Sequence, residues 1–323
     1  MATNFDISPE KANDFSQFLY RQFFTTPSPV SPETVNLTGQ TAIVTGSNGG
    51  IGLEVCKQLL GLGLSKLIIA VRDESKGDAA AASLSVISGE SVIEVWPLDM
   101  LSYDSIIALT ERASTLKRLD IVILNAAITR LYFQLNPSTG HEENIQVKLS
   151  LDRRIVIVST DAAGWGTFPE RNSDPLLPAF DEKEPTDMLD RYYTSKLLQH
   201  FFLREVVKHV PSSTATIILT SPGLVYGTEA LRDGKRNLKG LFDQIGSRLI
   251  VYSPEVGARQ IIDAATRNSA DIHGQFLCSQ KLTPLAPIIY TTEGKNISAR
   301  LWLETLEQLS FAELQEILKG IML

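Results

Sequence analysis

The sequence predicts an α/β protein with a doubly wound parallel sheet that is covered by helices on both faces. Three observations carry this prediction. Short apolar runs rich in β-branched residues alternate along the chain with longer segments of helical periodicity, which is typical of strand–helix–strand units. The apolar runs contain almost no polar residues, as expected for strands that are buried on both faces. A glycine-rich turn follows the first of these runs and leads directly into a helical segment.

The expected elements alternate over most of the chain. Six strands are predicted, at residues 42–44, 67–71, 92–95, 121–124, 155–158 and 217–219. Helices are predicted at about residues 50–62, 74–87, 102–116, 188–209, 228–247 and 254–267, with a further amphipathic helix at 297–318. With 323 residues and 43% apolar content the chain can bury one large core, so we expect a single domain over residues 34–323.

An N-terminal arm, residues 1–33, precedes this domain. The proline-rich segment 26–32 separates the arm from the first strand. The arm carries five aromatic residues, which are Phe15, Phe18, Tyr20, Phe23 and Phe24. We expect them to form a helix that docks on the domain by packing and takes no part in chemistry.

Charge and cysteine content exclude several classes of protein. The 30 basic and 37 acidic residues give a net charge of -7 without a long run of one sign, so we expect no nucleic-acid or membrane partner. No segment approaches the roughly 20 uninterrupted apolar residues of a membrane span. Cys56 and Cys278 lack metal or redox spacing and are expected to be buried thiols in the cytosol. The four histidines are dispersed, so no metal site is predicted.

Residues 45–52, Thr-Gly-Ser-Asn-Gly-Gly-Ile-Gly, are expected to hold the diphosphate of a dinucleotide. The glycines allow a turn that a Cβ would block, and a helix begins at Ile51. The free N–H groups and the positive dipole end of this helix then face the place where a pyrophosphate lies. The spacing is Gly-x-x-x-Gly-x-Gly and not Gly-x-Gly-x-x-Gly, so the loop needs the support of other motifs.

Tyr192 and Lys196 form a second candidate pair. Because they are four residues apart, they lie on one face of the predicted helix 188–209, whereas Tyr193 points about 100° away. A lysine ammonium beside a phenol is expected to lower the phenol pKa, so that the ring can exchange a proton near neutral pH. The preceding strand ends in Ser159 and Thr160, whose hydroxyls can face the phenol at the edge of the sheet where α/β ligands bind.

With these motifs in order, residues 34–320 resemble the short-chain dehydrogenase/reductase family, and within it the retinol-dehydrogenase-like members and the fungal secondary-metabolite subgroup. The resemblance implies a Rossmann-type fold and the catalytic residues Thr160, Tyr192 and Lys196. It also implies cofactor contacts from the glycine loop and from the ends of the later strands. These residues are Gly46, Ser47, Asn48, Gly50, Ile51, Gly52, Arg72, Lys76, Asp99, Asn125, Ala126, Lys196, Pro222, Gly223 and Thr228.

Arg72 bears on the choice of cofactor. It follows the second strand, where an acid would bind the ribose 2′-hydroxyl of NAD and where a cation suits the 2′-phosphate of NADP. The resemblance therefore implies NADP(H), with added contacts from Ser47 and Lys76. The alternative is that Arg72 forms a surface ion pair with Asp73 or Glu74.

The chain departs from the family pattern at two places. Thr160 replaces a serine, which keeps the hydroxyl but adds a methyl group that restricts χ1. Lys148 stands where the family has a catalytic Asn, and the segment 148–153 leads directly to the fifth strand, so most of one crossover helix is absent. Because this helix usually helps to form the family's dimer, the oligomeric state stays open.

The resulting expectation is an NADP(H)-dependent oxidoreductase that interconverts a carbonyl and an alcohol on a small molecule. The loops at about 162–187 and 224–250 are expected to choose the substrate. The first of them carries Trp165, Phe168, Leu176 and Phe180, which indicates a fairly apolar substrate, by resemblance a secondary metabolite. The alternative is a protein that binds the cofactor but has lost hydride transfer and serves a binding, scaffold or non-redox role.

Overall fold

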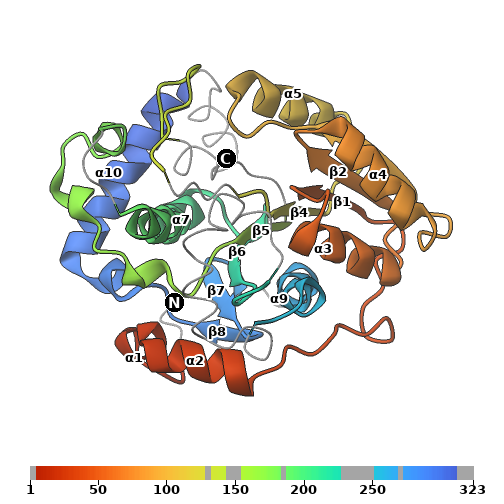
Figure 1. Cartoon of the computed structure of the whole chain (residues 1–323), viewed down its shortest axis with the longest axis horizontal. Coiled ribbons are helices and arrows are strands. Elements are labelled where there is room, and N and C mark those ends of the chain that lie inside the picture. The colour runs from red at the N-terminus through yellow and green to blue at the C-terminus, as the bar shows by residue number, and fades with distance from the viewer. Residues whose placement is uncertain are drawn as a thin grey trace.

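A computed structural model describes residues 5–127, 132–142, 154–182, 187–226, 251–267 and 272–310. The predicted helix 228–247, the shortened crossover around Lys148, and Thr228 lie outside these residues. Within them the elements follow the expected alternation of strands and helices, and the predicted α/β class is confirmed (Figure 1).

The sheet has eight strands in the order β3-β2-β1-β4-β5-β6-β7-β8. The strands are β1 (Thr41–Thr45), β2 (Lys66–Val71), β3 (Val92–Pro97), β4 (Ile121–Leu124), β5 (Arg154–Val158), β6 (Thr216–Ser221), β7 (Gln275–Cys278) and β8 (Lys281–Thr283). All neighbours pair in parallel except β7 and β8, which are antiparallel. Strand order reverses between β1 and β4, and the crevice at the carboxyl ends of the strands there is where such sheets bind ligands.

Strands β7 and β8 were not predicted from the sequence. These strands are only four and three residues long, and they are joined by Ser279 and Gln280, which adopt φ of 52° and 59°. Tight hairpins of this kind usually carry Gly or Asn at positive φ, so the usual sequence signal is absent here.

Helices cover both faces of the sheet (Figure 1). On one face α3 (Gly50–Gly61), α4 (Glu74–Ser85) and α9 (Pro254–Thr266) pack on a single apolar cluster that extends from β3 to β7. On the other face α5 (Tyr103–Ser114) packs on one cluster, and α7 (Met188–His209) with α10 (Thr292–Gln308) packs on another. The amphipathic helix predicted at 297–318 begins earlier, because Thr291 caps it by accepting a hydrogen bond from the Gly294 N–H.

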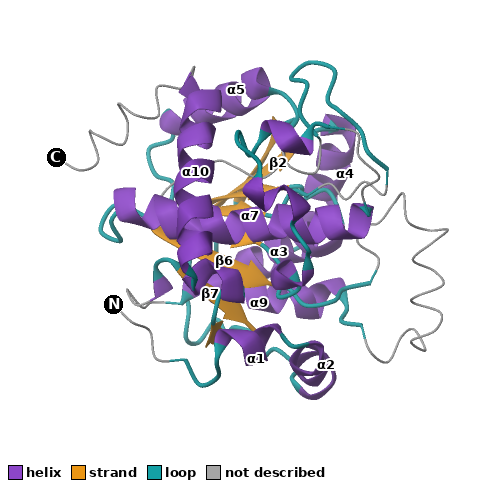
Figure 2. Ribbon diagram, turned by 90° about the vertical axis from the view of Figure 1, so that its left-hand side faces the viewer, coloured by secondary structure: helices purple, strands orange, loops and turns teal. Residues whose placement is uncertain are grey.

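The N-terminal arm forms α1 (Pro9–Asn13) and α2 (Phe15–Phe24), which lie beside the β7–β8 end of the sheet in both views (Figures 1 and 2). Ser8 and Asp14 cap the two helices with their side chains. The aromatic rings of Phe15 and Phe18 contact Trp165 at centroid distances of 5.4 and 5.1 Å. The predicted docking of the arm is therefore observed, at the loop that follows β5.

Candidate active site

The glycine loop after β1 has no room for side chains at two of its glycines. An ideal Cβ on Gly46, whose φ is 63°, would lie 2.8 Å from the Cα of Ala126. A Cβ on Gly52 would lie 2.5 Å from the Gly46 carbonyl oxygen. The loop therefore packs against the end of β4 more closely than any other residue type allows.

The first turn of α3 fits a dinucleotide diphosphate. Gly49 is the N-cap of this helix, and no side chain caps it. An ideal Cβ on Gly49 would meet no atom within 4 Å, so the space in front of the helix is open. Uncapped N–H groups and the positive end of the helix dipole bind phosphate groups. Ser47 is buried and donates its hydroxyl to the Val44 carbonyl at 2.8 Å, so its side chain supports the turn from inside.

Asn125 and Asp99 lie at the carboxyl ends of β4 and β3. The Asn125 side-chain amide donates to the carbonyl oxygens of Thr45 and Gly46 at 3.0 and 3.1 Å, and the Ala126 N–H donates to Thr45 Oγ1 at 2.9 Å. Asn125 therefore holds the glycine loop in place. The Asp99 carboxylate accepts a bond from the Leu101 N–H at 3.0 Å.

Arg72 is exposed immediately after β2. In the described part of the chain it forms no ion pair, so the alternative of a surface pair with Asp73 or Glu74 is not observed. Asp73 instead caps α4 by accepting a bond from the Lys76 N–H at 3.2 Å, and its carboxylate lies 3.5 Å from Lys76 Nζ. Among the described residues Arg72 is thus an unpaired cation at this edge of the sheet, whereas Lys76 pairs with Asp73.

The structure brings Thr160, Tyr192 and Lys196 to one end of the sheet. Helix α7 presents the Tyr192 phenol to the Thr160 hydroxyl, with which it is in hydrogen-bonding contact. Lys196 is buried, and its Nζ donates to the Val158 carbonyl at 2.8 Å. Burial lowers the pKa of Lys196 to about 8.

The Tyr192 phenol does not have the lowered pKa that the sequence led us to expect. Burial raises its pKa to about 12, and the charges of Tyr193 and Asp161 add to this effect, while the contact with Thr160 opposes it. The expectation was wrong because it weighed the nearby ammonium and left out the desolvation of the phenolate.

The loop after β5 differs from the expected substrate loop. Phe168, Leu176 and Phe180 are fully buried in the apolar cluster beneath α7, so they belong to the core and not to the wall of an open site. Apolar composition alone cannot distinguish these two places. Trp165 is partly exposed, and its ring packs on that of Tyr193 with a centroid distance of 5.7 Å. The Tyr193 ring in turn packs on that of Tyr192 with a centroid distance of 5.8 Å.

Gly223 follows β6 at the expected place and has a φ of 75°. Two residues that the sequence analysis did not connect with the site approach it: an ideal Cβ on Gly223 would lie 2.9 Å from the ring of Tyr252 and 3.0 Å from Gln22 Oε1. Arg21 and Asp161, the residue after Thr160, form a buried ion pair with 2.9 Å between Nη2 and Oδ2. This ion pair was also not predicted from the sequence. Such contacts join positions about 140 or 200 residues apart and leave no local sequence signal.

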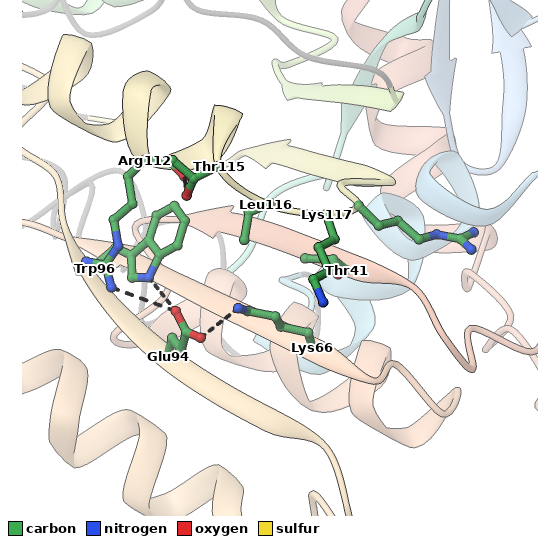
Figure 3. A pocket seen from close by; sticks show the side chains of 9 residues that line it. Thr41, Lys66, Glu94, Trp96, Arg112, Thr115, Leu116 and Lys117 are labelled. Carbon is green, nitrogen blue, oxygen red and sulfur yellow. Dashed lines mark hydrogen bonds and ion pairs between the residues drawn. The ribbon is translucent and has the colours of Figure 1, made fainter.

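A cavity of about 410 Å³ lies elsewhere, at the amino ends of β1 and β2 (Figure 3). Three of its polar side chains are engaged with one another, since Glu94 pairs with Lys66 at 2.6 Å and accepts from Trp96 Nε1 at 2.8 Å. It contains none of the expected site residues. The described residues contain no cluster of side chains that could hold a metal ion. Among them there is also no helix of the length and apolar character needed to cross a bilayer.

Comparisons with known proteins identify the family of the chain. Residues 40–149 match the family model described as short chain dehydrogenase. The chain is 41% identical to the short-chain dehydrogenase fogG of Aspergillus ruber, with 99% of each chain covered. The chain belongs to the short-chain dehydrogenase/reductase family. It is also 35% identical to the short chain dehydrogenase/reductase mfmJ of Annulohypoxylon moriforme, again over 99% of each chain.

Solved structures of this family share the fold. A short-chain dehydrogenase/reductase from Brucella melitensis aligns with a TM-score of 0.57 at 19% identity, covering 76% of this chain and 96% of its own. A 3-oxoacyl (acyl-carrier-protein) reductase from Agrobacterium tumefaciens, solved with NADP bound, aligns with a TM-score of 0.58 at 18% identity, covering 76% and 95%. The Rossmann-type architecture expected from the sequence is thereby confirmed.

Proposed function

We propose that the protein is an NADP(H)-dependent oxidoreductase that interconverts a carbonyl and a primary or secondary alcohol. The observation that carries the proposal is the contact between the Thr160 hydroxyl and the Tyr192 phenol, one helical turn from the buried Lys196. All three lie at the carboxyl edge of the sheet, on the same edge as the glycine loop. A proton donor, a hydroxyl and a cation at this edge are what carbonyl reduction requires.

A bound nicotinamide cofactor supplies the hydride in reduction and accepts it in oxidation. In reduction Tyr192 donates its phenolic proton to the substrate oxygen, and Thr160 donates a hydrogen bond to the same oxygen. The charge that develops on this oxygen is thereby neutralised where it forms. Lys196 holds the cofactor ribose and, when charged, favours the phenolate left behind on Tyr192.

The choice of NADP(H) over NAD(H) rests on Arg72. An exposed guanidinium without an acidic partner can bind a 2′-phosphate through paired charge-assisted hydrogen bonds. The NADP-bound reductase from Agrobacterium tumefaciens shows that this fold accepts the cofactor. No acid stands at position 72 to bind the free 2′-hydroxyl of NAD.

The proposed substrate is a fairly apolar ketone, aldehyde or alcohol of fungal secondary metabolism. Its apolar character is supported by a row of aromatic rings that runs from Tyr192 through Tyr193 and Trp165 to Phe18 of the arm, with centroid distances of 5.8, 5.7 and 5.1 Å. The fungal relatives support the biological setting. The cytosolic location stays a prediction.

The second candidate is a protein that binds the cofactor without hydride transfer. The Tyr192 pKa of about 12 and the bond from Lys196 to Val158 favour it, because the phenol is not poised to ionise. A panel of apolar carbonyl compounds assayed with NADPH, beside a direct NADPH titration, separates the two. Turnover of any panel member supports the oxidoreductase. Tight binding of NADPH with no turnover in either direction selects the second candidate.

A further inference from the structure

We propose that Arg21 and Gln22 of the N-terminal arm are positioning residues, which clamp the two loops that carry Thr160 and Gly223. The inference rests on the proposed function and deepens it, because it makes the arm part of the active site. From the sequence, the arm is expected to dock on the domain by packing and to take no part in chemistry. The contacts of these two consecutive residues show a more specific arrangement.

Arg21 holds the loop that follows β5. Its Nη2 and Nε donate to Asp161 Oδ2 at 2.9 and 3.2 Å, and Asp161 is the residue after Thr160. The guanidinium also donates to the Ala12 carbonyl at 3.1 and 3.2 Å, which ties α1 to the same point. The side chains of Arg21 and Asp161 are only 12% and 5% exposed. An ion pair this buried is stable only while both partners keep their geometry, so the arm and the Thr160 loop are coupled.

Asp161 extends this link to the next strand. Ser221 at the end of β6 donates its hydroxyl to Asp161 Oδ1 at 3.2 Å. The thiol of Cys278 on β7 contacts Oδ2 at 3.5 Å. One carboxylate therefore joins the arm to the ends of three adjacent strands at the edge of the sheet that carries the site.

Gln22 holds the loop that follows β6. Its Nε2 donates to the Leu224 carbonyl at 3.1 Å, and its Oε1 accepts from the Leu224 N–H at 3.0 Å. This two-point pairing satisfies both backbone groups of the residue next to Gly223. The Tyr252 hydroxyl donates to the Arg21 carbonyl at 2.9 Å and also contacts the Thr25 carbonyl, so it holds the end of α2 as well.

The arm closes tightly on the body of the domain. The cavity between them, lined by Ala12, Asn13, Asp161 and His200 among others, has a volume of about 10 Å³. A space of this size is about that of one water molecule. The Trp165 indole donates to the Asn13 carbonyl at 2.8 Å, and Asn13 Nδ2 donates to the Gly164 carbonyl at 3.2 Å. The arm therefore docks on the domain through specific hydrogen bonds as well as through packing.

The Arg21–Asp161 ion pair also acts on the Tyr192 phenol by charge. Among the described residues, Tyr193, Thr160 and Asp161 act on the Tyr192 phenol, with Lys196 one helical turn away, and the Asp161 carboxylate disfavours the phenolate. Among the described residues, the groups that act on Asp161 are Arg21, Ser221 and Cys278, together with Tyr252, whose pKa the Asp161 charge raises. Arg21 is the cation among them, so it offsets the negative charge next to the phenol. Loss of Arg21 should therefore both release the Thr160 loop and make Tyr192 harder to ionise.

The test compares Arg21→Leu with Arg21→Lys and with the control Lys11→Leu, which removes an exposed cation from α1 of the same arm. We measure kcat and KM for a carbonyl substrate, the Kd of NADPH, and hydrogen exchange of the backbone amides at 159–165 and 223–226. Arg21→Leu should lower kcat by about tenfold to a hundredfold, because small displacements of reacting groups have effects of this size. Arg21→Lys should recover part of the loss, and Lys11→Leu should have no effect.

Gln22→Leu, compared with Gln22→Glu, tests the second half of the clamp. The glutamate keeps an acceptor for the Leu224 N–H but loses the donor to its carbonyl. Faster exchange at 223–226 without a change at 159–165 is expected for Gln22→Leu, with a smaller effect for the glutamate. Equal exchange in both variants and the wild type would overturn the role of Gln22.

A pH profile separates positioning from simple loss of packing. In alcohol oxidation the rate rises with pH as Tyr192 ionises, so below the phenol pKa the rising limb of the profile for Arg21→Leu should lie at higher pH than that of the wild type. Adding Asp161→Asn removes the unpaired carboxylate and should return the rising limb toward that of the wild type. If the wild type turns over and Arg21→Leu matches Lys11→Leu in kcat, pH profile and exchange, the clamp is disproved while the proposed function stands. A wild type that binds NADPH without turnover overturns the proposed function and the positioning role together.

Discussion

Lys196 on α7 donates a hydrogen bond from Nζ to the main-chain carbonyl of Val158, the last residue of β5, at 2.8 Å. The bond spans 38 residues of sequence and fixes the helix that carries Tyr192 against the strand that leads to Thr160. Because the side chain is buried, its ammonium is poorly solvated and its pKa falls to about 8. The lysine therefore links the geometry of the site to the stability of the fold.

The first prediction concerns the dependence of stability on pH. Between about pH 8 and 10.5 the unfolded chain keeps a proton on Lys196 that the folded chain has lost, so the contribution of Lys196 to the free energy of unfolding should rise with pH in this window. The full contribution of this lysine is about 3 kcal/mol, and about half of it falls between pH 8.0 and 9.5. The buried thiols of Cys56 and Cys278 act in the opposite direction, because burial raises their pKa values. The lysine contribution is therefore measured as a difference between variants in urea unfolding at pH 8.0 and 9.5. Between these pH values Lys196→Met should lose stability relative to the wild type, whereas Lys295→Met, at an exposed position on α10, should follow the wild type.

The second prediction concerns the proton donor. Tyr192→Phe should lower kcat for carbonyl reduction by more than about a hundredfold, since only the transferable proton is lost. NADPH affinity and thermal stability should stay close to those of the wild type. Tyr193→Phe is the matched control, because its ring packs on Trp165 and its hydroxyl is one residue away from the pair. A larger loss for Tyr193→Phe would show that the wrong tyrosine has been assigned.

The third prediction concerns the cofactor. Arg72→Asp should weaken NADPH binding by about 1.5–3 kcal/mol, which is the contribution of a hydrogen bond to a charged group. NADH binding should change little or improve, because an acid can accept bonds from the free 2′-hydroxyl. Isothermal titration with both cofactors measures the difference. The control Arg118→Asp changes the net charge by the same amount, but at the amino end of the sheet. Equal weakening of both cofactors by Arg72→Asp would contradict the assignment to NADP.

The fourth prediction concerns His200, which is buried on α7. Its Nδ1 accepts a bond from the Ala286 N–H at 3.2 Å, and burial together with the charge of Lys196 lowers its pKa to about 3. As pH falls below 6.5 the unfolded chain gains a proton that the folded chain refuses, so stability should fall by about 2 kcal/mol between pH 7 and 5. His200→Asn keeps an acceptor and should flatten this dependence. His209→Asn, on the last turn of the same helix, should not.

Much of the fold could be predicted because burial leaves a strong local signal. Strands β1, β2, β4, β5 and β6 are largely buried, whereas β3 at the edge of the sheet is only partly buried. Each of the six appears in the sequence as a short, mainly apolar run with glycine, proline or a helical segment after it. The glycine loop, Asn125 and the Tyr192–Lys196 pair could be found for the same reason, since their spacing is local. The parts that were missed depend on contacts between distant positions.

The arm shows this limit most clearly. Its aromatic residues predicted that it docks, but nothing near Arg21 indicates that its partner is Asp161, 140 residues away. Nor does composition show that Phe168 and Phe180 are core residues, whereas Trp165 packs against the aromatic rings of the arm. The pKa of Tyr192 was wrongly predicted for a related reason, because burial is a property of the folded chain and outweighs a neighbouring charge.

The last prediction concerns the connection from β4 to β5, part of which lies outside the described residues. The match to the family model ends at Leu149, next to this break. The alignment with the Aspergillus ruber relative has 349 positions, 26 more than the 323 residues of this chain, so the chain must have gaps at no fewer than 26 of them. The alignment with the Annulohypoxylon moriforme relative has 345 positions, an excess of 22. An excess of this size corresponds to a sheet-covering helix with its flanking turns.

The core of the described residues is consistent with such a loss. One face of the sheet carries a single apolar cluster from β3 to β7, but the face covered by α5 and α7 carries two separate clusters. We therefore expect the natural transcript to encode about 20 more residues between Val147 and Arg154, enough for one covering helix, with the Asn that Lys148 replaces. Each large apolar side chain that such a helix covers contributes about 1.5–3 kcal/mol.

Sequencing of the transcript tests this expectation directly. A version of the protein with a family-type helix inserted at this place should unfold at higher temperature, turn over NADPH faster and dimerise in analytical ultracentrifugation. The matched control carries an insert of equal length made of glycine and serine, which lengthens the connection without covering the sheet. If the transcript contains no additional codons and the 323-residue chain is as stable and active as the version with the helix, the short crossover and Lys148 are native features of this protein.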